Sequence, residues 1–143
     1  MPISDLLRSK SRGDGVVTIA PSDSITVLLA ALAEHNVGAL PVVEGSEVCG
    51  IVSERDVVRH IARHGADILH KAVSEIMTTT VVSCASTDDV VQVATTMTDK
   101  RIRHMPVIDD GALTGIISIG DVVSSRIRQL EQDRVHLEQY ISG

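Results

Sequence analysis

The amino-acid sequence predicts an α/β fold in which two β-α-β-β-α repeats, related by a pseudo-twofold axis, pack sheet to sheet and precede a long C-terminal helix. The first observation is an internal repeat, because residues 16–61 align without a gap with residues 81–126, an offset of 65 residues. A fixed period of this kind defines the supersecondary unit. The second observation is that apolar patterns typical of strands and helices follow the same order in both copies. The third is geometric, since a sheet with helices on one face needs a second layer on the other, and the second copy can supply it.

Length and composition are those of a globular protein with an aliphatic core. The chain has 143 residues, of which 43% are hydrophobic and 22% charged, and it contains one Tyr, no Trp and no Phe. An aromatic platform for stacking single-stranded nucleic acid is therefore excluded. The formal net charge of −6 argues against general binding of polyanions, so we expect no nucleic acid partner.

Cysteine and histidine residues give no indication of a metal site. Cys49 and Cys84 do not form a C-x-x-C pair, and the histidines lack the spacing of metal ligands. We interpret both cysteines as small buried hydrophobic residues in a reducing compartment. No apolar run approaches the roughly 18 residues of a membrane span, and the N-terminus lacks the apolar region of a signal peptide. We therefore expect a cytoplasmic protein without membrane contact.

The predicted elements of the first copy are a leading helix, a polar loop, a strand, a helix, two strands joined by a turn, and a second helix, at residues 3–7, 8–15, 16–19, 24–35, 37–43, 48–52 and 55–64. Short runs rich in Val and Ile are typical of strands. The first long helix has apolar residues at spacings of three and four, with Ser22 or Asp23 as its expected N-cap and Asn36 at its end. Pro41 within the second strand indicates a sheet edge or a bulge, since proline has no N–H to donate.

The second copy repeats this order after a linker at residues 65–71. Its leading helix, strands and helices are predicted at residues 73–77, 81–84, 88–100, 102–108, 113–118 and from 121 onward. The domain division that follows is residues 1–71 for the first repeat with its leading helix and linker, residues 72–127 for the second repeat, and residues 128–143 for a helical extension.

The last helix is predicted to continue beyond the aligned repeat, to about residue 140. Ile127, Leu130, Leu137 and Ile141 recur at spacings of three, four or seven residues, and Arg134 occupies the missing position. This resembles about two heptads of a coiled-coil seam. This helix could pack against the protein's own core or against a second chain. A seam that extends beyond the repeat has no partner in its own copy, which favours a second chain.

Each copy carries one polar motif at the end of its last strand, with the sequence GIVSERD at residues 50–56 and GIISIGD at residues 115–121. Ser53 precedes Asp56, and Ser118 precedes Asp121, by three residues. This is the spacing of a helix capping box with Asp in place of the usual Glu or Gln. Capping and ligand binding are both open for a single motif, but recurrence at the same place in the second copy favours a functional role.

The doubled motif, each copy preceded by a strand with apolar residues before a proline, resembles a tandem pair of CBS domains (cystathionine β-synthase-type repeats, together a Bateman module). The resemblance covers residues 3–127. It is closer still to small stand-alone CBS-pair proteins of bacteria, through SERD at residues 53–56, RIRHMPV at residues 101–107 and SIGDVV at residues 118–123.

This resemblance implies binding of adenosine-containing ligands, such as AMP, ADP, ATP or NAD(H), in two clefts between the repeats. The motif aspartates Asp56 and Asp121 are expected to accept hydrogen bonds from the ribose hydroxyls, and Ser53 and Ser118 are expected near the phosphate. A carboxylate at a helix start suits a cis-diol, and first-turn N–H groups suit a phosphate. The adenine is expected against apolar side chains and main-chain groups of Val17, Thr18, Ala39, Leu40, Val82, Ser83, His104 and Met105.

The two copies differ in charge where ligand phosphates are expected. Arg55 stands where the second motif has glycine, and Arg103 and His104 stand where the first copy has Gly and Ala. By the geometry of the family, Arg103 and His104 are expected to reach across to the cleft that contains Asp56 and to bind anions there. We interpret the two cations just before them, at residues 100–101, as a solvated helix end. The Asp56 cleft is therefore expected to bind phosphate more tightly than the other.

Our leading hypothesis is a regulatory module that senses adenine nucleotides, needs no cofactor and is not an enzyme. No Ser/His/Asp set or acid/base pair emerges, and two aspartates related by a repeat suit two binding sites better than one catalytic pair. One alternative is a weak nucleotide-processing enzyme with His104 as a base. Another is an interaction protein with vestigial clefts. We also expect a homodimer formed through the helices of the repeats and the C-terminal helix.

Overall fold

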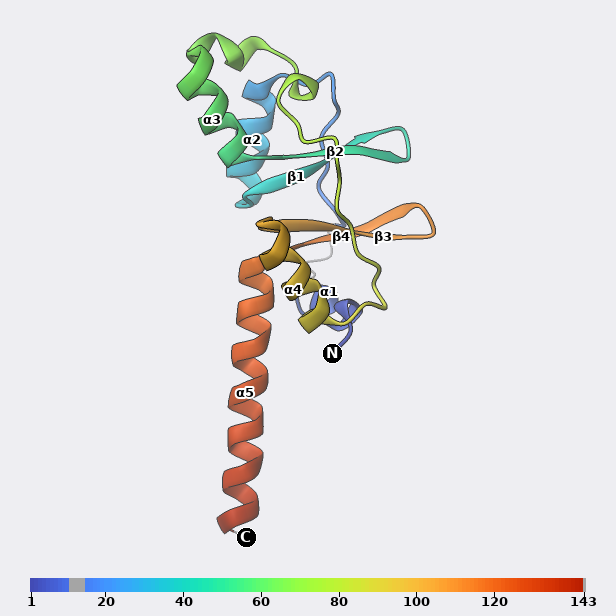
Figure 1. The fold of residues 1–143 in the computed structure, drawn as a ribbon, viewed down its shortest axis with the longest axis vertical. Helices are drawn as coiled ribbons and strands as arrows, with labels where there is room; N and C mark the ends of the chain where they lie inside the picture. The colour runs from blue at the N-terminus through green and yellow to red at the C-terminus, as the bar shows by residue number, and fades with distance from the viewer. Residues whose placement is uncertain (11–14, 143) are drawn as a thin grey trace.

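The computed structural model describes residues 1–10 and 15–142. Two β-hairpins lie one above the other in the middle of the molecule, helices cover their outer sides, and one long helix extends away (Figure 1). The elements in chain order are α1 (Ile3–Lys10), α2 (Ile25–His35), β1 (Ala39–Glu44), β2 (Glu47–Ser53), α3 (Glu54–His64), the short 3₁₀ helices η1 (Ala66–His70) and η2 (Val73–Glu75), α4 (Val90–Lys100), β3 (His104–Asp109), β4 (Ala112–Ser118) and α5 (Ile119–Ser142).

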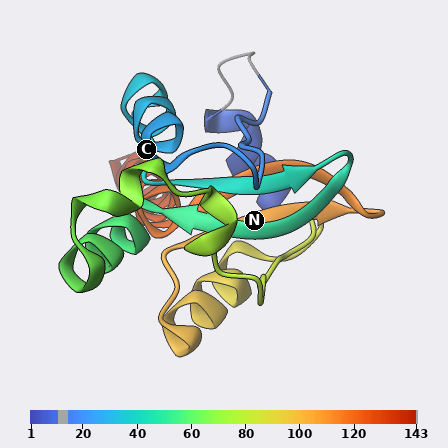
Figure 2. The same cartoon turned by 90° about the horizontal axis from the view of Figure 1, so that it is seen from above.

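Each repeat contributes one antiparallel hairpin, β1 with β2 and β3 with β4. The two registers are equivalent, with Leu40 opposite Val52 in the first hairpin and Met105 opposite Ile117 in the second. Both hairpins have an irregularity in register at the same place, between Val42 and Val43 in β1 and between Val107 and Ile108 in β3. The hairpins touch through β2 and β4 and lie stacked when seen from above (Figure 2). This confirms the predicted α/β architecture of two repeats packed sheet to sheet.

The strands predicted at residues 16–19 and 81–84 are wrong as strands, because each is reduced to a single parallel bridge, Ile19 with Val42 and Cys84 with Val107. The Ile19 N–H donates to the Pro41 carbonyl at 3.1 Å, and the Val43 N–H donates to the Ile19 carbonyl at 2.9 Å. The next rung would need an N–H of residue 41 to donate to the carbonyl of Val17, and proline has none. Pro41 therefore ends the pairing after one residue.

The N-cap of α2 is Ser24, so the predicted caps Ser22 and Asp23 are wrong. The Ser24 hydroxyl accepts from the Val27 N–H at 3.1 Å. Asp23 instead stabilises the turn before the helix, where its carboxylate accepts from the Ala20 N–H at 3.0 Å. The predicted end of the helix is confirmed, since Asn36 is the C-cap with φ of 51°, a left-handed conformation that Asn tolerates better than most residues.

Two aliphatic cores lie on the outer sides of the hairpins, and the leading segments of the repeats are exchanged between them. Ile3 and Leu6 of α1 belong to the core of the second repeat. Val73 and Ile76, which lead into the second repeat, belong to the core of the first. The predicted domain boundary at residue 71 separates the two sequence repeats. It does not separate the two cores, because α1 packs in the second core and the segment with Val73 and Ile76 packs in the first.

The leading helix is longer than predicted, whereas the predicted long C-terminal helix is confirmed. The leading helix continues to Lys10, so the first part of the predicted polar loop is helical, and residues 11–14 of that loop lie outside the described residues. The last helix, α5, has 24 residues. Its C-terminal half extends beyond the two repeats (Figure 1), and the seam residues Ile127, Leu130, Leu137 and Ile141 are all exposed.

Candidate functional site

The first motif forms a complete capping box at the start of α3. The Asp56 N–H donates to Ser53 Oγ at 3.2 Å, and Asp56 Oδ2 accepts from the Ser53 N–H at 2.8 Å. The Ser53 hydroxyl also lies 3.0 Å from Asp56 Oδ2. Both bonds that the carboxylate accepts end on Oδ2, and Asp56 Oδ1 has no hydrogen-bond partner among the residues that the structure describes. The cap thus orients the carboxylate and leaves one oxygen available.

The second motif repeats this geometry and adds a lysine. The Asp121 N–H donates to Ser118 Oγ at 3.1 Å, and Asp121 Oδ2 accepts from the Ser118 N–H at 2.9 Å. Lys10 Nζ of α1 also donates to Asp121 Oδ2, at 2.7 Å. Partial burial raises the pKa of the Asp121 carboxyl, but the hydrogen bond from Lys10 and the bonds from Ser118 outweigh it, and the net pKa is lowered. Asp121 is therefore held as a carboxylate.

A cavity of about 770 Å³ joins the second motif to the backbone of the first repeat. Residues from α1, from the segment before Ile19, from the start of β1, and from β3, β4 and α5 line it. It brings together six of the residues expected at the ligand site, namely Val17, Ala39, Leu40, His104, Ser118 and Asp121. Ala39 and Leu40 are almost fully buried, so they present mainly their backbone to the cavity.

The other expected site residues do not line this cavity. Ser53, Arg55 and Asp56 lie at the junction of β2 and α3, with the Arg55 side chain exposed. The second repeat's residues sit around its bridge and hairpin: Val82 is half-buried, Ser83 and Arg103 are exposed, and the Met105 side chain lies in the second core. Thr18 is exposed beside Val17.

His104 lies in the cavity with Asp121, whereas we expected it in the cleft with Asp56. A Cβ atom on Gly38 would be 3.3 Å from both Cε1 and Nε2 of His104 and 3.7 Å from Glu54 Oε1. The glycine therefore makes room for the imidazole between the repeats. Burial lowers the pKa of His104; Asp121 and Glu54 oppose this effect, while Lys10 and Arg103 add to it.

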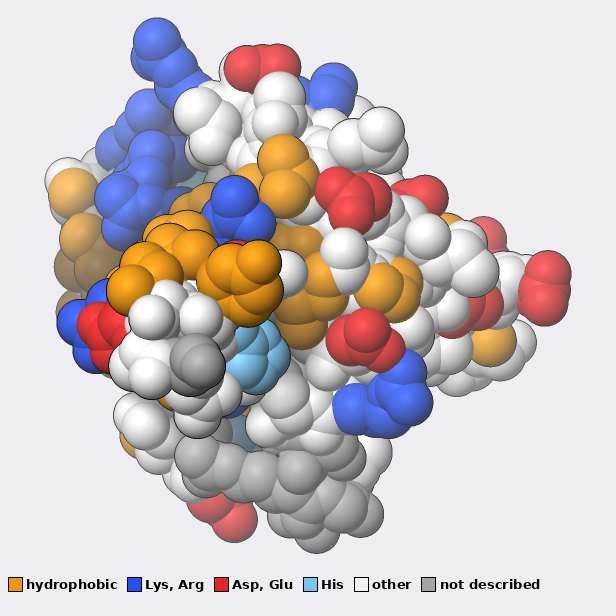
Figure 3. Space-filling model, turned by 90° about the horizontal axis from the view of Figure 1, so that it is seen from below, with side chains coloured by type: hydrophobic (Ala, Val, Ile, Leu, Met, Phe, Trp, Pro, Cys, Tyr) orange, Lys and Arg blue, Asp and Glu red, His pale blue; other side chains and the backbone are white. Residues whose placement is uncertain are grey.

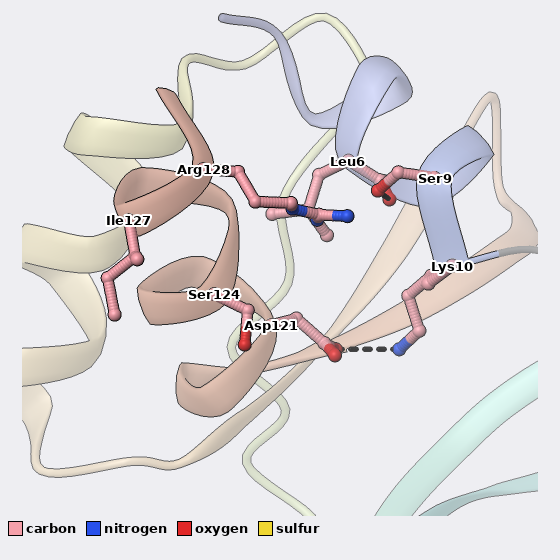
Figure 4. Close-up of a pocket in the computed structure, with 7 residues that line it drawn as sticks. All are labelled: Leu6, Ser9, Lys10, Asp121, Ser124, Ile127 and Arg128. Atoms are coloured by element: carbon pink, nitrogen blue, oxygen red, sulfur yellow. Dashed lines mark hydrogen bonds and ion pairs between the residues drawn. The ribbon is translucent and has the colours of Figure 1, made fainter. Parts of the chain in front are cut away.

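A smaller cavity, of about 440 Å³, lies between α1 and α5, and the ion pair between Lys10 and Asp121 forms part of its wall (Figure 4). Both cavities include Ser9, Lys10 and Asp121 in their lining. Sequence reasoning missed Lys10 because it assigned residues 8–15 to a loop of the first repeat. No spacing in the sequence indicates that α1 crosses to the second repeat.

The rest of the described chain offers little further site chemistry. Within residues 1–10 and 15–142, no group of three or more His, Cys, Asp or Glu side chains could hold a metal ion. Burial, with a smaller contribution from Asp88 and Asp109, raises the pKa of the Cys84 thiol to about 11, so it is a poor nucleophile. None of the helices in these residues is long and apolar enough to cross a membrane.

Comparison with curated proteins identifies relatives along almost the whole chain. CBS domain-containing protein CBSX3, mitochondrial, from Arabidopsis thaliana is 35% identical over 148 residues, which cover 99% of this chain and 72% of that protein. CBS domain-containing protein YhcV from Bacillus subtilis is 31% identical over 112 residues, which cover 78% of this chain and 79% of that protein.

Solved structures agree with the fold. A CBS-domain containing protein from Agrobacterium tumefaciens is 42% identical with a TM-score of 0.83 and covers 88% of this chain and 99% of its own. The CBS domain pair of protein MJ0100, solved in complex with 5′-methylthioadenosine and S-adenosyl-L-methionine, is 26% identical with a TM-score of 0.77 and covers 92% and 98%. The family model for the CBS domain matches residues 3–63 and again residues 73–128. The chain therefore belongs to the CBS-domain family, as a tandem CBS pair similar to small stand-alone CBS-pair proteins.

Proposed function

We propose that this chain is a regulatory module that binds adenosine-containing ligands between its two CBS repeats and does not catalyse a reaction. The observation that carries the proposal is the cavity of about 770 Å³ that joins Ser118 and Asp121 of one repeat to Val17, Ala39 and Leu40 of the other. Its volume lies within the range of roughly 300–1,000 Å³ that small-molecule sites occupy. A regulatory role fits a site built from both repeats, because ligand binding then stabilises one arrangement of the two.

The polar groups of this cavity suit the parts of a nucleotide. Asp121 Oδ2 is used by the cap and by Lys10, and Oδ1, which has no hydrogen-bond partner within residues 1–10 and 15–142, is suited to a ribose hydroxyl. The Ser118 hydroxyl and the Gly120 N–H in the first turn of α5 are suited to a phosphate. The neighbouring N–H groups of Ile119 and Asp121 already donate to the Arg103 carbonyl and to Ser118 Oγ. The Val17 carbonyl is left without its sheet partner, because Pro41 cannot donate. This carbonyl can therefore accept a hydrogen bond from the adenine amino group.

We propose an equivalent cleft at the first motif, by the pseudo-twofold relation of the repeats. Asp56 has the same capping geometry as Asp121, and its Oδ1 likewise has no hydrogen-bond partner among the described residues. Ser53 and Arg55 would face a phosphate there. The remaining residues assigned by the resemblance are Thr18, Val82, Ser83, Arg103 and Met105.

The MJ0100 complex supports an adenosyl ligand, because both molecules bound by that relative contain adenosine. MJ0100 is only 26% identical to this chain, and it supports the adenosyl class without naming one ligand. We propose AMP, ADP, ATP or NAD(H) as the ligand of this chain. We further propose that the protein is cytoplasmic, requires no cofactor and forms a homodimer. The Arabidopsis relative is a mitochondrial protein, and the cytoplasmic location is proposed for this chain alone.

A thermal-shift screen with AMP, ADP, ATP, NAD, NADH and S-adenosylmethionine tests the proposal. At a ligand concentration 100 times the Kd, binding stabilises the folded state by about 2.7 kcal/mol, which raises the Tm of a domain of this size by several degrees. A double variant, Asp56→Asn with Asp121→Asn, keeps an oxygen for each helix cap and should lose the shift. Flat curves for all six ligands, from protein shown by mass spectrometry to carry no bound nucleotide, would contradict the proposal and favour an interaction protein.

Chromatography of the same ligands after incubation separates a binding module from an enzyme. We expect ATP and NADH to be recovered unchanged. Their conversion at a rate that His104→Gln abolishes would instead support the alternative of a nucleotide-processing enzyme with His104 as its base.

A further inference from the structure

Lys10 makes two contacts at the wall of the large cavity. Its Nζ donates to Asp121 Oδ2 at 2.7 Å and to the Ile116 carbonyl at 2.8 Å. Figure 4 shows Lys10 reaching from the end of α1 to Asp121 at the start of α5. The side chain of Lys10 is 36% exposed and that of Asp121 is 27% exposed, so water screens this pair only in part.

Among the residues that the structure describes, the first motif has no counterpart of this lysine. Aligning the leading segments places Thr80 where the first has Lys10. In the first repeat, the carbonyl of Ile51, which corresponds to Ile116, accepts its hydrogen bond from the backbone N–H of Thr78 at 2.9 Å. Lys10 thus replaces a backbone contact in the second repeat, and within the described part of the chain a cation pairs with Asp121 but not with Asp56.

The charged side chains around the large cavity balance one another, so an anionic occupant meets no excess negative charge. Among the described residues, its charged lining consists of Arg8, Lys10 and Asp121, and Arg8 forms an ion pair with Asp5 on its own helix. Without Lys10, Asp121 would be a half-buried carboxylate beside any phosphate that entered, and like charges at such distances repel. With Lys10, that carboxylate is neutralised while Oδ1 remains available.

We infer that Lys10 is a specificity-determining residue of the Asp121 cavity, which makes this cavity prefer phosphate-bearing adenosine ligands to neutral adenosine. The inference rests on the proposed function. A neutral nucleoside gains nothing from a cation near its ribose, whereas a phosphate is attracted by Lys10 and would be repelled by an unpaired Asp121.

Isothermal titration calorimetry with AMP and adenosine tests this role. The Asp56→Asn protein isolates the Asp121 cavity, and Lys10→Met is added to it. We expect the affinity for AMP to fall about tenfold, the equivalent of ~1.4 kcal/mol, and the affinity for adenosine to stay the same or to rise. Lys10→Arg should retain the preference for AMP. Lys71→Met should change neither affinity, because it removes the same charge from an exposed pair with Glu75 outside the cavity.

The outcomes separate this inference from the proposed function. If the unmodified protein binds neither AMP nor adenosine, the proposed function fails. If the unmodified protein binds them and Asp56→Asn abolishes all binding, the Asp121 cavity is not a site and the inference is overturned alone. An equal loss for both ligands in Lys10→Met, or no loss for AMP, also overturns it. Circular dichroism melting of each variant establishes that the comparison is between folded proteins.

Discussion

His104 is a titratable side chain at the contact between the repeats, and its environment disfavours the charged form. The ring fills the space left by Gly38, and burial lowers its pKa, with Lys10 and Arg103 acting in the same direction. Asp121 and Glu54 act in the opposite direction but do not cancel the effect. Folding therefore favours a neutral imidazole at this position.

This predicts a loss of stability on acidification that depends on His104. Because the folded pKa lies below the unfolded value of about 6.5, the unfolded chain takes up the proton first as the pH falls. Stability is then complete above that value and decreases as the pH falls from about 6.5 toward the folded pKa. Melting temperatures of the unmodified protein and of His104→Gln, measured between pH 8 and pH 5, should diverge at the acid end, with the variant losing less stability.

The control is His136→Gln, which alters an exposed histidine on α5 and should follow the unmodified protein. If the melting temperatures of all three proteins fall equally at acid pH, the role of His104 is refuted.

Candidate site residues could be predicted from the sequence where they occur at equivalent positions in both repeats. Ser53, Asp56, Ser118 and Asp121 were found because the same spacing occurs twice, and the structure shows each pair as a capping box. The placement of His104 beside Asp121 was not predicted, since it depends on how the two repeats lie against each other. Contacts between the two repeats cannot be read from a characteristic spacing of residues in the sequence.

The motif glycines allow the leading segments to lie against the hairpins. A Cβ on Gly115 would be 2.6 Å from Leu7 Cδ2, at the movable end of a leucine. A Cβ on Gly50 would be 2.8 Å from Met77 Sδ and 3.0 Å from the Thr78 carbonyl oxygen. The backbone oxygen cannot swing away, because Thr78 is held in a bridge with Ile51.

Alanine substitutions should therefore destabilise the two hairpins unequally. Gly50→Ala should lower the free energy of unfolding by about 1–3 kcal/mol, the usual cost of overpacking, and Gly115→Ala should cost less because Leu7 can change rotamer. Gly120→Ala is the matched control, since its Cβ would meet only Ser118 Oγ at 3.6 Å and alanine favours a helix; it should be neutral or stabilising. Urea denaturation measures all three. A larger loss for Gly120→Ala than for Gly50→Ala would show that these contacts do not decide the stability.

The α-helices and hairpins could be predicted from the sequence to within a few residues, while the first strand of each repeat could not. The leading helix predicted at residues 73–77 is also wrong as an α-helix, because only the short 3₁₀ helix η2 forms there. The apolar runs at residues 16–19 and 81–84 have the composition of strands, but pairing depends on the donors of the facing strand. Pro41 and Pro106 withhold one donor each, so only Ile19 and Cys84 pair. The exchange of α1 was also unpredictable, because its apolar residues would suit either of two similar cores.

In the molecule as a whole, exposed apolar side chains form a continuous surface that would be buried in a protein–protein interface. Val58 on α3 and Val123 on α5, which correspond in the two repeats, are 64% and 51% exposed. Ile127, Leu130, Leu137 and Ile141 continue this surface along α5. Seen from the C-terminal end of α5, hydrophobic side chains gather around the helix next to Lys and Arg side chains (Figure 3). Arg134, in the gap of the seam, is paired with Glu131 and Glu138 on its own helix, so its charge does not prevent apolar contact along the seam.

We predict that a second copy of this chain covers that surface, so that light scattering at micromolar concentration reports about twice 15.3 kDa. Burying one aliphatic side chain contributes about 1.5–3 kcal/mol, and a seam repeated on two antiparallel or parallel helices buries several. Ending the chain after Arg126 should therefore shift the protein toward the monomer, as should Leu130→Lys with Leu137→Lys. Gln132→Lys with Gln139→Lys adds the same charge two residues further along, on the opposite side of the helix, and should leave the dimer intact. A monomer in the unmodified protein would refute the prediction, whereas a dimer that survives the truncation would assign the interface to the helices of the repeats, with α5 left outside it.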